Sequence, residues 1–262
     1  MLWMGRLFMS ESPPIPDLTD YRPSRDLLRD RVILVTGAGQ GLGRAAALAF
    51  AVHGATVILH GRNVGKLEQV YDDIEQAGGI QPAIFPLDLE NAGTKDFDAL
   101  AQAIKLQLGR LDGILHNAAL LPGLSPLNNQ TFEQWHVSLR VNLISPFALT
   151  RACFPLLKAS ADASVVMTSD THGHTPAAYW GAFAVAKAGV EALVKIQAQE
   201  WEMVPHLRIN TLIPGPVRSP QRARTHPGEI KQTMRDPQDL TSLYLYLIGP
   251  DSRAVSGRTV FC

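Results

Sequence analysis

The sequence is short of cysteine, of surplus positive charge and of long apolar runs. Its two cysteines, Cys153 and Cys262, have no metal-binding spacing, so we expect unpaired thiols in a reducing compartment and no metal site. Lysine plus arginine equals aspartate plus glutamate at 24 each, which argues against a nucleic-acid-binding protein. The first ten residues are too short for a signal peptide, and no later run approaches the roughly 18 apolar residues of a spanning helix. We therefore expect a cytoplasmic protein that binds neither nucleic acid nor a membrane.

Short apolar segments alternate regularly with amphipathic ones along the 262 residues. The segments expected to form strands are 31–36, 55–60, 81–89, 112–118, 163–169, 207–213 and 257–262. Those expected to form helices are 43–54, 64–77, 94–108, 131–158 (bent at Pro146 and ending near Pro155), 180–201 and 236–248. This alternation predicts a Rossmann-type, doubly wound α/β fold, with a mostly parallel seven-stranded sheet and helices on both faces. Residues 31–262 are predicted to form one domain, preceded by a surface arm, 1–30, rich in proline, serine and charge.

A glycine-rich stretch, "TGAGQGLG" (36–43), separates the first predicted strand from the first helix. A helix N-terminus presents free amides and the positive end of its dipole, so phosphate binds there. Gly37 permits a sharp turn, and Gly41 and Gly43 let the backbone approach a pyrophosphate. Glycine strings often mark nothing more than tight turns, but this placement predicts a dinucleotide site.

The second predicted strand ends in "LHGRN" (59–63), without the carboxylate that an NAD site normally places there. Gly61 leaves room instead, and Arg62 offers a cation for a ribose phosphate. We therefore expect NADP(H) to be preferred over NAD(H), with a solvated surface arginine as the alternative for Arg62.

The succession of motifs resembles the short-chain dehydrogenase/reductase family from Arg31 to Cys262. It comprises the glycine motif, "LDL" (87–89), "HNAA" (116–119), "RVNLISPF" (140–147) and "PGPVRS" (214–219), while "WGAFAVAK" (180–187) is similar to the bacterial YciK-like branch. The resemblance implies cofactor contacts from Gly37, Gln40, Gly41, Leu42, Gly43, Arg62, Asp88, Leu89, Asn117, Lys187, Pro214, Gly215 and Val217. Gln40 stands where NADP-preferring relatives often carry a base, which weakens the NADP(H) interpretation. Family members form dimers and tetramers through the helices corresponding to 131–158 and 180–201, so we expect a homodimer or homotetramer.

In that family, catalysis rests on asparagine, serine, tyrosine and lysine side chains. The resemblance matches Asn142 and Lys187 to the first and last, whereas Asp170 and Phe183 stand at the serine and tyrosine positions. One hypothesis is an NADP(H)-dependent oxidoreductase that acts on an unidentified carbonyl or alcohol with an altered acid. The other is a nucleotide-binding pseudoenzyme that senses or scaffolds. We predict dinucleotide binding with weak or absent conventional ketoreductase activity.

Neighbouring side chains offer few replacements for the missing groups. Tyr179 lies one helical turn before Phe183, and its hydroxyl should point away from the site. His172 and His174, in a predicted loop, could donate protons but are more often solvated. The simplest expectation is an ion pair between Asp170 and Lys187 across the space of the missing phenol.

Overall fold

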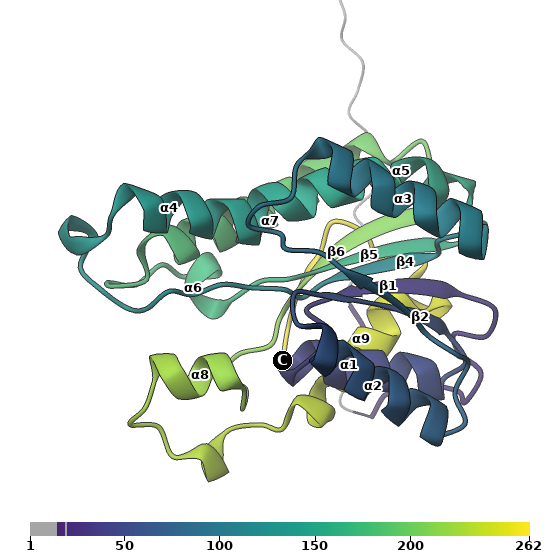
Figure 1. Ribbon diagram of the computed structural model, residues 1–262, viewed down its shortest axis with the longest axis horizontal. Coiled ribbons are helices and arrows are strands. Elements are labelled where there is room, and N and C mark those ends of the chain that lie inside the picture. The colour runs from purple at the N-terminus through teal and green to yellow at the C-terminus, as the bar shows by residue number, and fades with distance from the viewer. Residues whose placement is uncertain (1–14, 19) are drawn as a thin grey trace, which may run out of the picture.

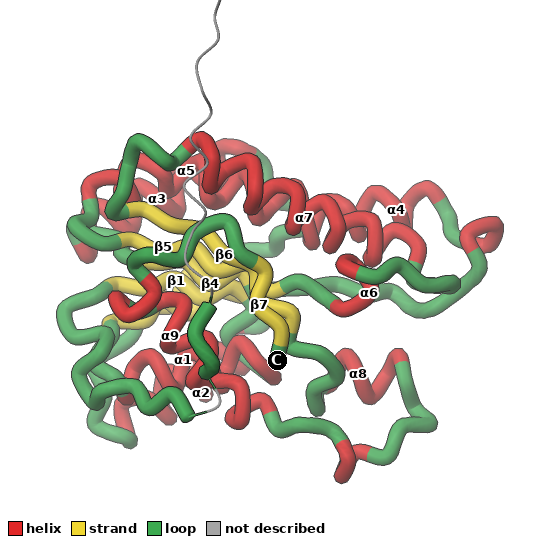
Figure 2. Tube along the Cα trace, turned by 180° about the vertical axis from the view of Figure 1, so that it is seen from behind, coloured by secondary structure: helices red, strands yellow, loops and turns green. Residues whose placement is uncertain are grey.

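The computed structural model describes residues 15–18 and 20–262 and contains one parallel seven-stranded sheet, of order β3-β2-β1-β4-β5-β6-β7 (Figure 2). The strands are β1 (Val32–Thr36), β2 (Thr56–Gly61), β3 (Ala83–Pro86), β4 (Gly113–His116), β5 (Ala163–Thr168), β6 (Leu207–Ile213) and β7 (Thr259–Phe261). The predicted Rossmann-type α/β fold is confirmed. The carboxyl ends of the parallel strands all lie at one edge of the sheet, where ligands bind in this class of fold.

Helices cover both faces of the sheet (Figure 1), so the central strands are buried at every position and not at alternate ones. On one face lie α1 (Gly41–Val52), α2 (Val64–Gln76) and α9 (Thr241–Ile248). On the other lie α3 (Thr94–Leu108), α4 (Phe132–Leu139), α5 (Ser145–Ala159) and α7 (Gly181–Glu200). Two short helices, α6 (Thr171–His174) and α8 (Pro220–Thr225), follow β5 and β6. Short 3-10 turns occupy Leu127–Asn129, Lys231–Thr233, Pro237–Leu240 and Pro250–Ser252. None of the helices in the described ranges could cross a membrane.

The expected long helix over 131–158 is two helices joined by a π-helical segment, Arg140–Ile144. Pro146 lies in the first turn of α5 and has no N–H to donate to the preceding helical turn, and the irregular π-helical segment comes directly before it. The predicted end near Pro155 is wrong, because α5 continues to Ala159 with Leu157 buried in the core.

The described part of the predicted arm packs against the domain. The Tyr21 hydroxyl donates to the Asp251 carboxylate at 2.7 Å, and its ring meets Tyr246 edge-on. Leu27 and Leu28 are buried in the core. Residues 1–14 and 19 lie outside the described residues.

Candidate functional site

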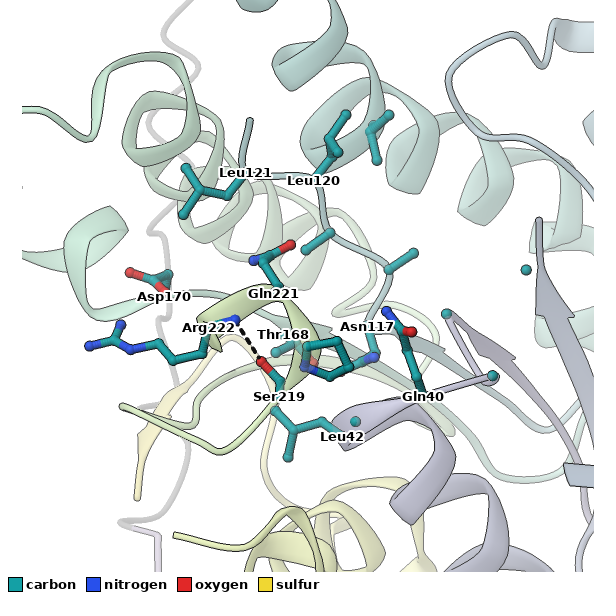
Figure 3. A pocket seen from close by; sticks show the side chains of 18 of the residues that line it. Gln40, Leu42, Asn117, Leu120, Leu121, Thr168, Asp170, Ser219, Gln221 and Arg222 are labelled. Carbon is teal, nitrogen blue, oxygen red and sulfur yellow. Dashed lines mark hydrogen bonds between the residues drawn. The ribbon is translucent and has the colours of Figure 1, made fainter. Parts of the chain in front are cut away.

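A cleft of about 950 Å³ opens at the carboxyl edge of the sheet (Figure 3). Its floor lies where β1 stands between β2 and β4, the point at which the strand order reverses. Of the residues that the sequence nominated, the cleft wall includes Gly37, Gln40, Gly41, Leu42, Arg62, Asp88, Leu89, Asn117, Asp170, Phe183, Lys187, Pro214, Gly215 and Val217. Gly43 and Asn142 lie behind the wall.

The turn before α1 is shaped so that only glycine fits it. Gly37 and Gly41 have left-handed backbone angles, with φ of 69° and 55°. A Cβ on Gly43 would overlap the carbonyl oxygen of Gly37. The N-cap residue Gln40 makes no side-chain cap, so the first amides of α1 remain free to bind an anion at the cleft. This cradle fits the pyrophosphate of a dinucleotide.

Cations gather at the end of β2. Arg62 is 61% exposed at its side chain, with its guanidinium 3.8 Å from Asp88 and 3.9 Å from Glu90. Lys66, which the sequence interpretation missed, donates from Nζ to Oε1 of Gln40 at 2.5 Å and also lines the cleft. Asn63 caps α2 by accepting from the Lys66 amide, which turns this lysine back toward the glycine turn. A basic side chain on α2 therefore contacts Gln40. In the sequence, the spacing Arg62-x-x-x-Lys66 at a helix start was the signal that could have predicted this contact.

Asn142 braces the cleft from behind. It is 1% exposed, and its amide oxygen accepts from the backbone N–H of Leu120 at 3.0 Å. Its amide nitrogen donates to the carbonyls of Leu120 and Ser138, each at 2.8 Å. The π-helical segment that carries Asn142 is thereby tied to the loop leaving β4, which forms the cleft wall.

The fold brings Lys187 and Phe183 together on one side of the cleft, one helical turn apart on α7. Lys187 is 4% exposed; its Nζ donates to the Thr168 carbonyl at 2.8 Å and lies 5.6 Å from the centre of the Phe183 ring. Burial lowers the pKa of Lys187 to about 8, while the Asp170 carboxylate opposes that shift. Phe183 is 3% exposed and packs with Leu121 and Trp180. The ammonium thus faces a hydrocarbon ring instead of a phenol.

The expected contact ion pair between Asp170 and Lys187 is wrong. Asp170 caps α6 instead, accepting from the backbone N–H of His172 at 2.8 Å, and its carboxylate lies 3.0 Å from Nδ1 of the same histidine. The local turn satisfies free amides at the helix start without ordering a distant partner, so it wins over the long-range pair. Asp170 still lines the cleft, and its charge acts on Lys187 from a distance.

The neighbouring hydroxyls are committed elsewhere. Tyr179 has a left-handed backbone and is 57% exposed, away from the cleft wall, as expected. The Ser169 hydroxyl bonds Glu191, whose other oxygen lies 2.8 Å from Nδ1 of His174. The Thr168 hydroxyl meets that of Tyr244. These groups therefore do not replace the missing phenol.

A segment after β6 lies across the reactive end and adds cleft residues to those nominated individually from the sequence. Figure 3 shows Ser219, Gln221 and Arg222 of this segment over the cleft. His226, which follows α8, also lines the cleft, and its ring centre lies 5.6 Å from that of Trp180. Trp180 in turn stacks on His172 at 3.7 Å. These contacts join positions far apart in the chain, so no local sequence pattern predicts them.

A buried histidine lies on the cleft floor at the end of β2. His60 is 1% exposed, and among the described residues neither of its ring nitrogens has a hydrogen-bond partner. Burial lowers its pKa to about 4, and burial with nearby His60 and Lys187 lowers the pKa of His116 to about 3. An unpartnered buried ring nitrogen beside the cleft also fits a nucleotide-binding pocket. Across residues 15–18 and 20–262, no group of three His, Cys, Asp or Glu side chains is arranged to hold a metal ion.

The fold and its cleft have counterparts among known proteins. A sequence profile described as short chain dehydrogenase matches residues 31–229. The uncharacterized oxidoreductase YciK of Escherichia coli K12 is 44% identical over 239 residues, which cover 91% of this chain and 94% of that protein. Two structures described as short chain dehydrogenases, from Escherichia coli CFT073 complexed with NADPH and from Shigella flexneri 2a complexed with NADP, are 44% and 42% identical. Each has a TM-score of 0.88 and covers 91% of this chain and 99% of its own. The chain belongs to the short-chain dehydrogenase family of oxidoreductases.

Proposed function

We propose that this protein is an NADP(H)-dependent oxidoreductase of a carbonyl or alcohol substrate in which proton transfer does not use a phenol. The observation that carries the proposal is Phe183 beside Lys187 in a cleft whose phosphate cradle is intact. The relatives complexed with NADP and NADPH support the choice of cofactor.

Different residues of the cleft would bind different parts of the cofactor. The free amides of α1 would hold the pyrophosphate, and Arg62 with Lys66 would hold the phosphate on the adenosine ribose. Asp88 and Leu89 would meet adenine, and the buried ammonium of Lys187 would bind the nicotinamide ribose. Asn117, Pro214, Gly215 and Val217 also line the cleft and would complete this set. The bound cofactor would supply a hydride.

Aspartate at position 170 and phenylalanine at position 183 would lower the rate of turnover without preventing cofactor binding. Loss of a positioned general acid costs about 10²–10⁴ in rate. An ionised Asp170 on the cleft wall also opposes negative charge developing on a substrate oxygen. Orientation of two bound reactants still accelerates hydride transfer. Turnover of ordinary carbonyls is therefore slow. The same substitutions favour the second candidate, a dinucleotide-binding pseudoenzyme that senses or scaffolds.

The test is turnover by the unmodified protein. We expect slow, NADPH-dependent reduction of activated carbonyls from a broad panel, followed by NADPH fluorescence. Rates equal to those of a tyrosine-containing relative, measured beside it, would contradict the proposal. NADPH binding without any turnover would leave the pseudoenzyme in its place.

We propose further that α5 and α7 pair with a second copy of the chain. Phe147 on α5 and Val185 and Ile196 on α7 are exposed large apolar side chains. Ile144, just before α5, is exposed as well. Burying such side chains between copies would remove apolar surface from water.

A further inference from the structure

The reactive end of the cleft carries three side chains that exchange protons in water: Asp170, Lys187 and His226. The Asp170 carboxylate already accepts from the His172 amide. Lys187 is held by the Thr168 carbonyl on the α7 side of the cleft. His226 comes from the opposite side, on the segment that lies across the cleft. Of these three side chains, His226 is therefore the one whose contacts explain least about its role in the fold.

The hydrogen bonds around His226 assign roles to its two ring nitrogens. The Thr225 hydroxyl donates to the Gln221 carbonyl at 3.1 Å, so its proton is used. Its oxygen lies 2.8 Å from Nδ1 of His226 and, with its proton on the Gln221 carbonyl, would accept from an Nδ1–H group. Among the described residues no hydrogen bond engages Nε2. Neutral His226 is thus the Nδ1–H tautomer, and Nε2 is the atom that gains or loses a proton.

Aromatic contacts link this ring, through Trp180, to Phe183 at the position of the missing phenol. The centres of the His226 and Trp180 rings are 5.6 Å apart, and those of Trp180 and Phe183 are 6.0 Å apart. Trp180 is buried and is fixed on its other side by His172. One indole therefore bridges His226 and Phe183 on the wall of the same cleft.

We propose that Nε2 of His226 exchanges the substrate proton in place of the phenol, a role that rests on the proposed oxidoreductase function. A carbonyl carbon that receives hydride from the reduced cofactor passes its π electron pair to oxygen. That oxygen takes the proton of the imidazolium Nε2, giving an alcohol, oxidised cofactor and neutral imidazole. Water then returns a proton to the ring. In the reverse direction neutral Nε2 accepts the alcohol proton.

The groups that face His226 set the pH dependence of this step. They are Arg222 and Glu229 on its own segment, and His172 and Asp170 across the cleft. Burial and Arg222 lower the pKa of His226, with His172 acting the same way and the two carboxylates opposing. Reduction therefore falls as pH rises through this depressed pKa, whereas alcohol oxidation rises.

The test compares His226→Asn with His206→Asn, a control at the opposite end of the sheet where a partly buried histidine contacts the Lys158 carbonyl. With NADPH and methyl benzoylformate as probe, we expect His226→Asn to lower kcat about 10²-fold or more and to abolish its pH dependence. His206→Asn should change neither. Adding Phe183→Tyr to His226→Asn should recover the loss, because the phenol then supplies the proton.

Two binding readouts separate the possible failures. NADPH fluorescence titration should give equal affinities for the variants and the unmodified protein. Nuclear magnetic resonance of nitrogen-labelled histidine should show the Nδ1–H tautomer for His226, and Thr225→Val should lose it while Thr225→Ser keeps it. No NADPH binding would overturn the proposed function and this role with it. NADPH binding with no turnover by the unmodified protein would do the same, whereas turnover with an unchanged rate or pH profile in His226→Asn would overturn the role of His226 alone.

Discussion

Rebuilding the family side chains in this cleft should raise the rate of carbonyl reduction. The double variant Phe183→Tyr, Asp170→Ser restores a phenol on the cleft wall and a hydroxyl at the end of β5. Lys187 Nζ lies 5.6 Å from the centre of the ring to be changed, so a phenol there has a cation close by that favours its ionised form. The serine keeps the cap of α6, because serine and aspartate are nearly equal at this position.

The expected gain follows from two functions: the phenol acid, which the proposed His226 acid replaces only in part, and the hydroxyl donor to the developing oxyanion, which is missing. A positioned acid is worth about 10²–10⁴ in rate, and one donor to a developing oxyanion about 10²–10³. Because groups of one catalytic unit are not additive, the product is an upper limit, and we expect about 10³ for the double variant. Each single variant should gain less. Removing the Asp170 carboxylate also removes a charge that opposes the oxyanion.

The assay is NADPH-dependent reduction of the carbonyl panel at saturating cofactor. Phe132→Tyr is the matched control, because it adds the same hydroxyl to an exposed phenylalanine on α4 outside the cleft wall. Its rate should stay at that of the unmodified protein. The reasoning fails if the double variant folds and binds NADPH but gains less than about tenfold, since the rest of the site would then be incompetent.

Four further changes probe other parts of the account. Gly43→Ala should abolish NADPH binding, because a Cβ meets the backbone of the glycine turn, whereas Gly123→Ala, with open space around it, should bind normally in the same fluorescence titration. Lys66→Gln should lower the affinity for NADPH about tenfold or more and leave the affinity for NADH unchanged, because a charge-assisted hydrogen bond to the extra phosphate is lost. Equal losses of affinity for the two nucleotides would argue against a phosphate contact. Burial lowers the pKa of His60 in the folded protein to about 4, against about 6.5 in the unfolded chain. Its contribution to stability is therefore fully present above pH 6.5, and about 3 kcal/mol of the free energy of unfolding is lost as the pH falls toward 4. His60→Leu should remove that part of the acid sensitivity in urea unfolding at several pH values; an unchanged profile would refute the assignment. If two copies pair through α5 and α7 as proposed, Phe147→Glu should lower the mass measured by sedimentation, and an unaltered mass would contradict that interface.

The fold and the cofactor cleft were largely predictable because they depend on local patterns. Buried strands between amphipathic helices give the sheet, and Gly37 and Gly41 mark a turn that other residues cannot form without strain. The bend near Pro146 was predictable from the proline, but the π-helical form of the segment before it was not. That segment carries Asn142, whose amide bonds a loop more than twenty positions earlier in the chain.

The reactive end was predicted only in part. Asp170 was paired with the distant Lys187, although the nearer amide of His172 offers a cap at little entropic cost. The arrangement of His226 beside Trp180 joins a segment after β6 to the start of α7, and neither stretch carries a periodic or motif signal for it. Long-range aromatic contacts of this kind emerge from packing and not from sequence spacing.

Titration of the purified protein with NADPH and NADH, followed by nucleotide fluorescence, measures whether the cleft binds the cofactor at all. We expect saturable binding of both nucleotides, with NADPH the tighter because Arg62 and Lys66 would contact its extra phosphate. No saturable binding of either nucleotide would contradict it.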